Sequence, residues 1–306
     1  MNVLSLFDGM SCGQLALQRA GIQVENYYAA EIDKYAIKVT QANFPSTVQL
    51  GDVTAIDTDS LPDIDLLIGG SPCQGFSFAG KQLNFDDPRS KLFWEYVRLL
   101  NALKPKYFLL ENVKMKKESM DVITSALRVD PIFINSNLVS AQNRQRYYWT
   151  NIPVDKLPDD KGIILADILE DGHVDRDKSH CIDANYFKGG NLKSYFEKHR
   201  RQLVFSKDGM CHVGDAGISD KYAYVNRVYH PSGKSPSLVA SDGGHLQPKV
   251  SKGTTEYRKL TPLECERLQT VPEGYTDHVS NTQRYKMLGN GWTVDVVSHI
   301  MKGLTQ

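Results

Sequence analysis

The sequence lacks the features that mark secreted, membrane-spanning and metal-binding proteins. Its 306 residues contain no apolar run approaching the roughly 18 residues that cross a bilayer. The start, MNVLSLFDGM, has no basic segment before a long apolar stretch. The five cysteines form no CxxC pair, which argues against a zinc site and a disulfide framework. We therefore expect a soluble, cytoplasmic protein with reduced thiols and no metal site.

The chain also lacks an excess of charge of either sign. Lys and Arg together number 36, as do Asp and Glu, so the formal net charge is zero. The global basic excess of many nucleic-acid-binding proteins is therefore absent, and any such binding requires basic side chains concentrated on one face. The hydrophobic share of 41% is ordinary for a globular protein, so the chain can form one large fold or a larger domain with a smaller insert.

Apolar runs and amphipathic stretches alternate from Asn2 to Pro153. We expect strands over residues 2–7, 26–33, 47–53, 63–70 and 106–113, and helices over residues 11–21, 34–44 and 90–105. This alternation is typical of a parallel α/β sheet with crossover helices.

This alternation of apolar runs and amphipathic stretches ends after Pro153. Residues 155–255 are rich in Gly, Asp, Lys and isolated aromatics without helical periodicity, which predicts a second, loop-rich domain. The α/β character returns over residues 261–272 and 292–304. Thr261 and Glu264 form a capping-box pattern at the start of the first of these segments.

Ligands of open α/β folds bind at the carboxyl ends of the strands, so the turns there can be interpreted as a site. The first turn, FDGMSCG, contains Gly9 and Gly13, which let a ligand approach backbone N–H groups and a helix N-terminus. The turn is not a GxGxxG motif. Taken alone, it favours a plain structural turn over a cofactor-binding turn.

Acidic residues end the next two predicted strands. Glu31 follows the glycine turn by about 20 residues and can accept hydrogen bonds from ribose hydroxyls, or it is a solvated carboxylate. Asp52 can accept a hydrogen bond from an exocyclic amine such as adenine N6, or it is an ordinary helix N-cap. No Lys follows the glycines as in a P-loop, so a nucleoside-bearing cofactor is favoured over a phosphate-rich one.

A cysteine stands in the fourth turn, GGSPCQGFS, directly after the apolar run DLLI. Pro72 fixes the backbone before Cys73, and a strand-end loop can provide both the exposure and the thiolate stabilisation that a nucleophile needs. The polar segment that follows, FAGKQLNFDDPRSK, suits a mobile lid. The alternative is a structural turn with an inert thiol.

Two further motifs bring polar side chains toward the same edge of the sheet. LLENV places Glu111 and Asn112 on a strand predicted to neighbour the strand before the cysteine, where a carboxyl can share a proton with a ring nitrogen. QNRQRYY presents Gln142, Arg144 and Arg146 at alternating positions, so the two arginines share one face. They either hold an anionic or carbonyl-bearing ligand or are solvated.

In this order, the motifs resemble those of the DNA cytosine-5 methyltransferase family, bacterial or phage type. The matching segments are FDGMSCG, AEID, GDV, SPCQGFS, ENV, QNRQRYY, RKLTPLECERLQTVPEGY and YKMLGNGWTVDVV. The resemblance covers residues 1–153 and 256–303. Asp8, where many members have a small residue, and Trp292 resemble the animal de novo branch of the family.

The resemblance implies a Rossmann-like methyltransferase sheet formed by residues 1–155 plus 283–306 and a smaller target-recognition domain formed by residues 156–282. It implies S-adenosyl-L-methionine as cofactor, with adenine stacking on apolar side chains such as Ile32 and Val53. The cofactor residues it implies are Phe7, Asp8, Gly9, Gly13, Glu31, Ile32, Asp52, Val53, Pro72, Leu92, Asn290 and Trp292.

The resemblance also implies the chemistry. Cys73 adds to C6 of a cytosine that has left the duplex, which makes C5 reactive toward a methyl group. Glu111 hydrogen-bonds the base edge, Arg146 contacts the base carbonyl, and Arg144 supports the loop geometry. The expected partner is double-stranded DNA, bound by a monomer without membrane attachment. A restriction endonuclease acting on the same site, an orphan mark and phage self-protection all remain open as contexts.

Two alternatives remain at this point. A tRNA cytosine-5 methyltransferase shares the fold, but its usual Cys-Phe-Thr signature is absent here. A non-catalytic DNA-binding relative would have lost nucleophile or cofactor motifs, whereas Cys73, Glu111, Arg146 and Asn290 are all present. The recognition sequence depends on residues 155–255 and does not follow from the motifs.

Overall fold

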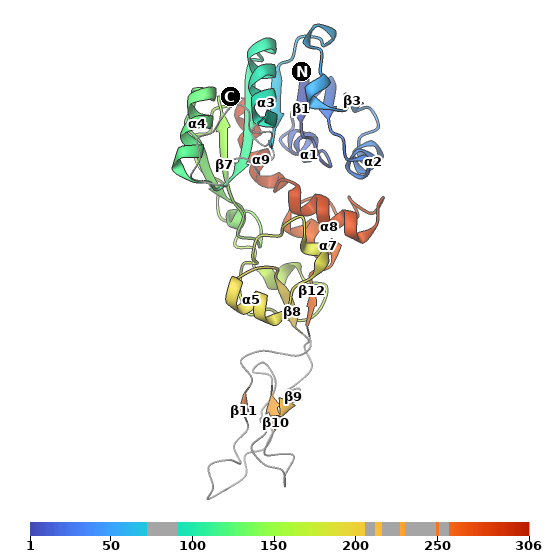
Figure 1. The fold of residues 1–306 in the computed structure, drawn as a ribbon, viewed down its shortest axis with the longest axis vertical. Helices are drawn as coiled ribbons and strands as arrows, with labels where there is room; N and C mark the ends of the chain where they lie inside the picture. Colours follow the sequence, from blue (N-terminus) through green and yellow to red (C-terminus); the bar gives the residue numbers. More distant parts are fainter. Residues whose placement is uncertain (72–90, 206–211, 216–226, 230–248, 251–256, 306) are drawn as a thin grey trace, which may run out of the picture.

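The computed structural model describes residues 1–71, 91–205, 212–215, 227–229, 249–250 and 257–305. Its centre is a seven-stranded sheet with the strand order β3-β2-β1-β4-β5-β7-β6 (Figure 1). The strands are β1 (Asn2–Leu6), β2 (Asn26–Ala30), β3 (Val48–Gln49), β4 (Leu66–Gly69), β5 (Tyr107–Val113), β6 (Ile132–Asn135) and β7 (Gln145–Thr150). β1 to β5 pair in parallel, as the sequence predicts.

The last two strands differ from the parallel pattern expected up to Pro153. β7 is antiparallel to both β5 and β6. Only residues 136–144 join β6 to β7, and this is too short for the crossover of about a dozen residues that a parallel pair needs. The edge of the sheet therefore closes with a hairpin, and β7 is inserted beside β5.

Helices cover both faces of the sheet. α1 (Cys12–Arg19), α2 (Lys34–Asn43) and α9 (Val294–Met301) contribute to one buried cluster, and α3 (Lys91–Leu103) and α4 (Lys117–Leu127) contribute to the other. Neighbouring strand residues alternate between the clusters, because successive side chains of a strand point to opposite faces. Leu66 and Ile68 join the first cluster, and Leu67 joins the second. The C-terminal helix thus packs on the N-terminal sheet.

The remaining elements extend from the carboxyl end of the sheet (Figure 1). They are α5 (Leu192–Lys198), β8 (Leu203–Phe205), β9 (His212–Asp215), β10 (Arg227–Tyr229), β11 (Lys249–Val250), β12 (Tyr257–Lys259), α7 (Pro262–Leu268) and α8 (Asn281–Asn290). Short 3-10 helices lie at Val53–Ala55, Thr58–Ser60, Ser136–Leu138, Leu165–Ile168, Tyr186–Lys188 and Lys302–Thr305. β8 pairs antiparallel with β12, and β9, β10 and β11 form a separate sheet.

The buried core of the described residues continues from the main sheet into these elements. The cluster that contains Val3 and Ile68 also contains Tyr186, Val204 and Leu260. The predicted capping box at the start of α7 is confirmed, with reciprocal hydrogen bonds between Thr261 and Glu264. Among the described residues, no helix combines the length and apolarity of a membrane span.

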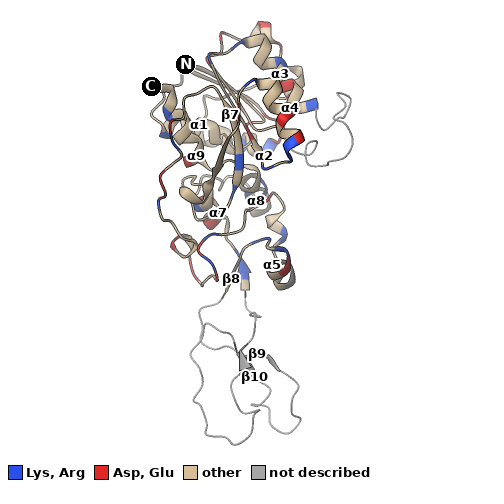
Figure 2. Ribbon diagram, turned by 90° about the vertical axis from the view of Figure 1, so that its left-hand side faces the viewer, with Lys and Arg blue, Asp and Glu red and all other residues tan. Residues whose placement is uncertain are grey.

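Charged residues of both signs are spread over the described ribbon. Figure 2 shows Lys and Arg interspersed with Asp and Glu rather than gathered on one face of the part drawn in colour. Several cations are neutralised by ion pairs within the fold, as between Lys161 and Asp295 at 2.5 Å and between Lys286 and Asp33 at 2.8 Å. Any electrostatic attraction to an anion must therefore come from local groups.

Candidate active site

The turn after β1 has an unusual backbone. Phe7, Gly9 and Ser11 have φ angles of 58°, 61° and 62°, which glycine adopts freely but other residues rarely do. The Glu31 carboxylate at the end of β2 fixes this turn, because its Oε2 accepts a hydrogen bond from the Gly9 amide at 2.8 Å. Its Oε1 accepts from the amides of the next two residues, each at 2.8 Å. Left-handed residues held in this way often mark functional sites.

Asp8 lies within the same turn in a buried setting. Burial raises the pKa of the Asp8 carboxyl from 3.8 to about 6, although the Tyr27 hydroxyl donates a hydrogen bond to its Oδ1 at 2.8 Å. Its other oxygen, Oδ2, is buried and makes no hydrogen bond of normal geometry with a described residue. A buried acceptor without a partner suits a ligand that brings a donor.

The two glycines of the turn have different surroundings. A Cβ built at Gly9 would meet nothing within 4 Å, so the space beside this residue is open. A Cβ at Gly13 would lie 2.4 Å from Ile68 Cδ1 and 3.0 Å from the Tyr27 hydroxyl oxygen. Gly9 therefore leaves room for a ligand, whereas Gly13 allows α1 to pack closely against β4.

The two residues predicted to contact adenine also differ in their exposure to solvent. Ile32, which follows Glu31, is 75% exposed, whereas Val53 is buried in the core beneath the sheet end. Of this pair, Ile32 offers the free apolar surface for stacking. Phe7 and Leu92 are partly buried against the same core cluster as Val53.

Asp52 is an exposed N-cap, as one of the two interpretations expected. Its Oδ1 accepts hydrogen bonds from the amide and the hydroxyl of Thr54, both at 2.9 Å, and these bonds lower the pKa of Asp52. The second carboxylate oxygen engages no described residue. Asp52 is exposed, so this oxygen can accept a further hydrogen bond, and the capping role and ligand binding are compatible.

Glu111 and Arg146 form a closely held pair at the end of β5. Arg146 Nε lies 2.6 Å from Glu111 Oε1, with the two side chains 13% and 11% exposed. Burial opposes the charge of Arg146, but the Glu111 carboxylate outweighs it and raises the pKa of the guanidinium. Trp292 Nε1 donates a hydrogen bond to the other carboxylate oxygen, Oε2, at 3.1 Å. Each oxygen of Glu111 thus has its own partner.

The segment with the predicted nucleophile begins beside this pair. Asn112 Nδ2 lies 3.3 Å from the Ser71 hydroxyl oxygen and 3.4 Å from the Ser71 carbonyl oxygen. Pro72 and Cys73 follow directly but lie outside the described residues, so their assigned roles stay predictions. β4 and β5 are neighbours, as the sequence predicts, and the last described residue before Cys73 is held by the strand of Glu111.

Arg144 has a different environment from Arg146. It is buried, and its two Nη atoms donate to the carbonyl oxygens of Ile182, Gly289 and Gly291 at 3.2, 3.2 and 2.7 Å. Its Nη1 also lies 3.3 Å from Cys181 Sγ. These contacts hold the backbone on both sides of Asn290, which is exposed at the end of α8, and support a positioning role for Arg144.

Two residues of the candidate site were not predicted from the sequence. Gln269 is buried, donates to the carbonyl oxygens of Leu288 and Gly291 at 2.6 and 3.2 Å, and accepts from the Thr293 hydroxyl at 2.9 Å. Gln269 and Arg144 therefore hold the turn of Trp292 together, since both donate to the Gly291 carbonyl oxygen. The second is Gly70, where a Cβ would lie 2.9 Å from Trp292 Nε1 and 3.1 Å from Glu111 Oε2. The paired glycines after β4 were the available signal, but they indicated only the end of a strand.

Comparison with known proteins identifies the family. The family model described as C-5 cytosine-specific DNA methylase matches residues 1–306. The chain belongs to the C-5 cytosine-specific DNA methylases. It is 38% identical to the orphan methyltransferase M.SPRI of Bacillus phage SPR, covering 99% of this chain and 97% of that one. It is 30% identical to the Type II methyltransferase M1.ScrFI of Lactococcus lactis subsp. cremoris, covering 99% and 78%.

The fold agrees with a solved structure. The Entamoeba histolytica methyltransferase EhMeth aligns with a TM-score of 0.68 at 18% identity, covering 99% of this chain and 97% of that one. The predicted family and the mixed α/β fold of a methyltransferase are thereby confirmed.

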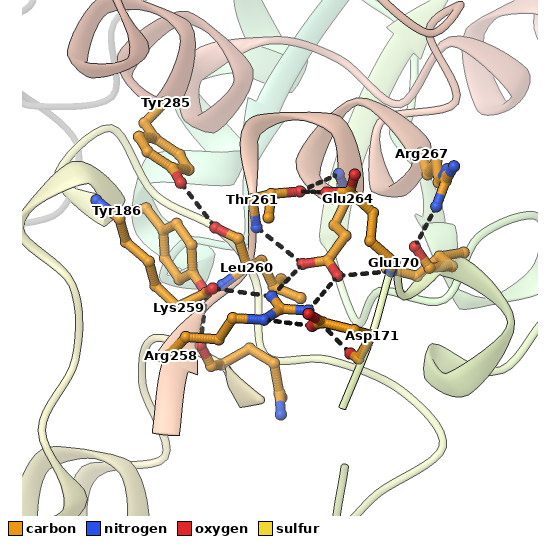
Figure 3. A network of polar contacts seen from close by, with 12 residues as sticks. Glu170, Asp171, Tyr186, Arg258, Lys259, Leu260, Thr261, Glu264, Arg267 and Tyr285 are labelled. Atoms are coloured by element: carbon orange, nitrogen blue, oxygen red, sulfur yellow. Dashed lines mark hydrogen bonds and ion pairs between the residues drawn. The ribbon is translucent and has the colours of Figure 1, made fainter. Parts of the chain in front are cut away.

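In this DNA methylase, a polar network joins β12 to α7 (Figure 3). The side chain of Glu264 is fully buried, and both of its oxygens accept hydrogen bonds from Arg258, at 2.8 Å each. These bonds raise the pKa of Arg258. Glu264 also accepts from the amides of Glu170 and Thr261 at 2.9 and 2.8 Å, and Arg258 Nε donates to Asp171 at 2.7 Å. These hydrogen bonds of the methylase therefore attach β12, the strand that follows residues 206–256, to the elements next to the sheet.

Proposed function

We propose that this chain transfers a methyl group from S-adenosyl-L-methionine to C5 of a cytosine flipped out of double-stranded DNA. The observation that carries the proposal is the pair of Glu111 and Arg146 at the end of β5, beside the residue that leads to Cys73. The pair presents a carboxylate and a guanidinium side by side. This arrangement suits the edge of cytosine, where ring N3 and the amino group lie next to the carbonyl oxygen.

The proposed reaction begins with the Cys73 thiolate. The thiolate bonds to C6 of cytosine, and the C5–C6 π electrons move to C5, while a proton shared by Glu111 at N3 stabilises the adduct. S-adenosyl-L-methionine, when bound, would supply the methyl group that C5 takes up, and the electrons of the broken C–S bond would stay with its sulfur. Loss of the C5 hydrogen to solvent as a proton restores the C5–C6 double bond and expels the thiolate. Arg146 holds the base carbonyl during these steps.

The ends of β1, β2 and β3 fit a nucleoside cofactor. The strand order reverses between β1 and β4, and such a switch point is where open α/β sheets bind ligands. Around it lie the open space beside Gly9, the unpartnered Oδ2 of Asp8, the exposed Ile32 and the free oxygen of Asp52. These groups would hold the amino-acid and adenosine parts of S-adenosyl-L-methionine.

We further propose the division of labour along the chain. Residues 1–155 plus 283–306 would bind the cofactor and perform the chemistry, which the packing of α9 on the sheet supports. Residues 156–282 would read the DNA sequence. Flipping the base costs a few kcal/mol in lost pairing and stacking, which contacts from this part would offset.

Covalent trapping tests the proposal. Fluorine at C5 cannot leave as a proton, so DNA with 5-fluorocytosine at the recognition site should remain attached to Cys73 after methyl transfer. We expect a denaturation-resistant complex that requires the cofactor and that disappears in Cys73→Ser, because a serine hydroxyl is almost never ionised near neutral pH.

Cys181→Ser is the matched control, since Cys181 is exposed and lies beside Arg144. This variant should still form the complex. A Cys73→Ser protein that forms the adduct or methylates DNA at the normal rate would show that the mechanism is wrong.

A further inference from the structure

Trp292 lies between the predicted cofactor turn and the base-binding pair. A Cβ at Gly13, in the first turn of α1, would lie 3.4 Å from Trp292 Cζ3, so one edge of the indole reaches the helix that follows the glycine turn. The other edge carries Nε1, which donates to Glu111 Oε2 at 3.1 Å. One rigid ring therefore joins α1, the helix that follows the glycine turn, to the Glu111 carboxylate.

The hydrogen bond from Trp292 determines the orientation of Glu111. The carboxylate is buried, and its Oε1 is paired with Arg146. Oε2 accepts the hydrogen bond from Trp292, so the two partners together fix the rotation of the carboxylate plane. Gly70 allows this geometry, because any side chain there would occupy the space where Trp292 Nε1 and Glu111 Oε2 meet. A small displacement of the indole would leave one oxygen without a donor.

The backbone around Trp292 is held firmly. The Gly291 carbonyl oxygen accepts hydrogen bonds from Arg144 and Gln269, at 2.7 and 3.2 Å. Thr293, on the other side, is held by its hydroxyl on Gln269. The side chain of Trp292 is only partly buried, so the ring has an accessible surface while its attachment is fixed. A ligand against that surface can shift or lock the ring without moving the turn.

We propose that Trp292 is a positioning residue that couples cofactor binding to the orientation of the Glu111 carboxylate, and thereby to the binding of the target base. This inference rests on the proposed function. A cofactor seated at the glycine turn would press on the indole and fix the N–H toward Glu111. By thermodynamic reciprocity, a base held by Glu111 would then strengthen cofactor binding by the same factor.

Trp292→Phe is the appropriate change because it keeps an aromatic ring and removes the N–H donor. The matched control is Trp149→Phe, since Trp149 Nε1 donates to the Thr124 hydroxyl at 2.9 Å in the core between β7 and α4. Both variants lose one indole hydrogen bond, but only Trp292 contacts the site. Urea unfolding of each variant reports the purely structural loss.

The first measurement needs no turnover. The affinity for DNA with the recognition sequence is determined with and without S-adenosyl-L-homocysteine, and the ratio gives the coupling factor. We expect a factor well above one in the unchanged protein and in Trp149→Phe, and a factor near one in Trp292→Phe. The affinity of Trp292→Phe for the cofactor alone should stay within about threefold, because the ring remains.

The second measurement is the rate of a single methyl transfer at saturating cofactor and DNA. We expect Trp292→Phe to be slower by about tenfold, in the range for the loss of one hydrogen bond to a charged group, and Trp149→Phe to be unchanged. An unchanged coupling factor in Trp292→Phe, a factor of one in the unchanged protein, or equal losses in both variants would overturn the inference. If the unchanged protein does not methylate DNA at all, the proposed function itself has failed.

Discussion

Replacing Asp8 with Asn tests how the fold tolerates a buried carboxylate beside the glycine turn. Burial raises the pKa of Asp8 from 3.8 to about 6, so the folded protein holds this proton more tightly than the unfolded chain does. The resulting stabilisation is fully present below the unfolded pKa of 3.8 and is lost as the pH rises through the folded pKa of about 6. Since one pKa unit corresponds to about 1.4 kcal/mol, the complete loss is about 3 kcal/mol.

The Asp8→Asn protein has no such proton to lose. The free energy of unfolding, measured by urea titration at several values between pH 4 and pH 7, should therefore fall less steeply for the variant than for the unchanged protein. The difference between the two curves should grow by about 2 to 3 kcal/mol in favour of the variant across this range. Parallel curves would refute the reasoning, because they would mean that Asp8 titrates alike in both states.

Asp33→Asn provides a control of opposite sign. Although partial burial opposes its charge, hydrogen bonds from Lys286 and from the Tyr35 amide lower the pKa of Asp33. The stabilisation from Asp33 is present above its unfolded pKa and is lost as the pH falls. The difference curve for this variant should therefore stay nearly level from pH 4 to pH 7 and slope the other way only when the titration is extended below pH 4. Two curves of the same sign would indicate a general effect of removing a carboxylate.

Three further predictions concern binding. Asp52→Asn keeps the oxygen that caps the helix but replaces the free acceptor oxygen by an amide donor, so it should weaken cofactor binding about tenfold without changing DNA affinity. Asp57→Asn, at an equivalent N-cap, should change neither affinity. Arg144→Lys cannot reach all the carbonyl oxygens it holds and should lower the free energy of unfolding by about 3 kcal/mol in urea titrations, with cofactor affinity falling in calorimetry. Replacing the exposed lysines of residues 114–117 by Ala should reduce the slope of log DNA affinity against log salt by about one unit for each lysine. Lys156→Ala should leave this slope unchanged, because Lys156 is paired with Asp159.

Local signals in the sequence predicted the parts of the fold that depend on local structure. The capping box of Thr261 and Glu264 is such a case, because its two hydrogen bonds join residues three positions apart. The parallel strands followed from buried apolar runs that alternate with amphipathic helices. The antiparallel β7 did not follow, because its direction depends on the length of the connection from β6 rather than on its own residues.

The site shows the same limit. The alternating spacing of Arg144 and Arg146 predicted a shared face, but only the tertiary structure separates the buried Arg144, bound to backbone carbonyls, from Arg146, bound to Glu111. Burial likewise distinguishes Ile32 from Val53, two apolar residues that the sequence treats alike. The contact of Trp292 with Glu111 joins residues 181 positions apart and has no local signature.

The pairing of β8 with β12 has a consequence for how such enzymes diversify. Phe205 and Tyr257 lie opposite each other in this ladder, so the chain leaves toward residues 206–256 and returns from them at neighbouring points. The ion pair of Arg258 with Glu264 fixes the returning strand. An insert whose ends are anchored side by side can be lengthened or replaced at little entropic cost. Under the proposed function, in which residues 156–282 read the DNA sequence, residues 206–256 could therefore be exchanged for a segment with a different sequence preference while Glu111 and the glycine turn stay unchanged.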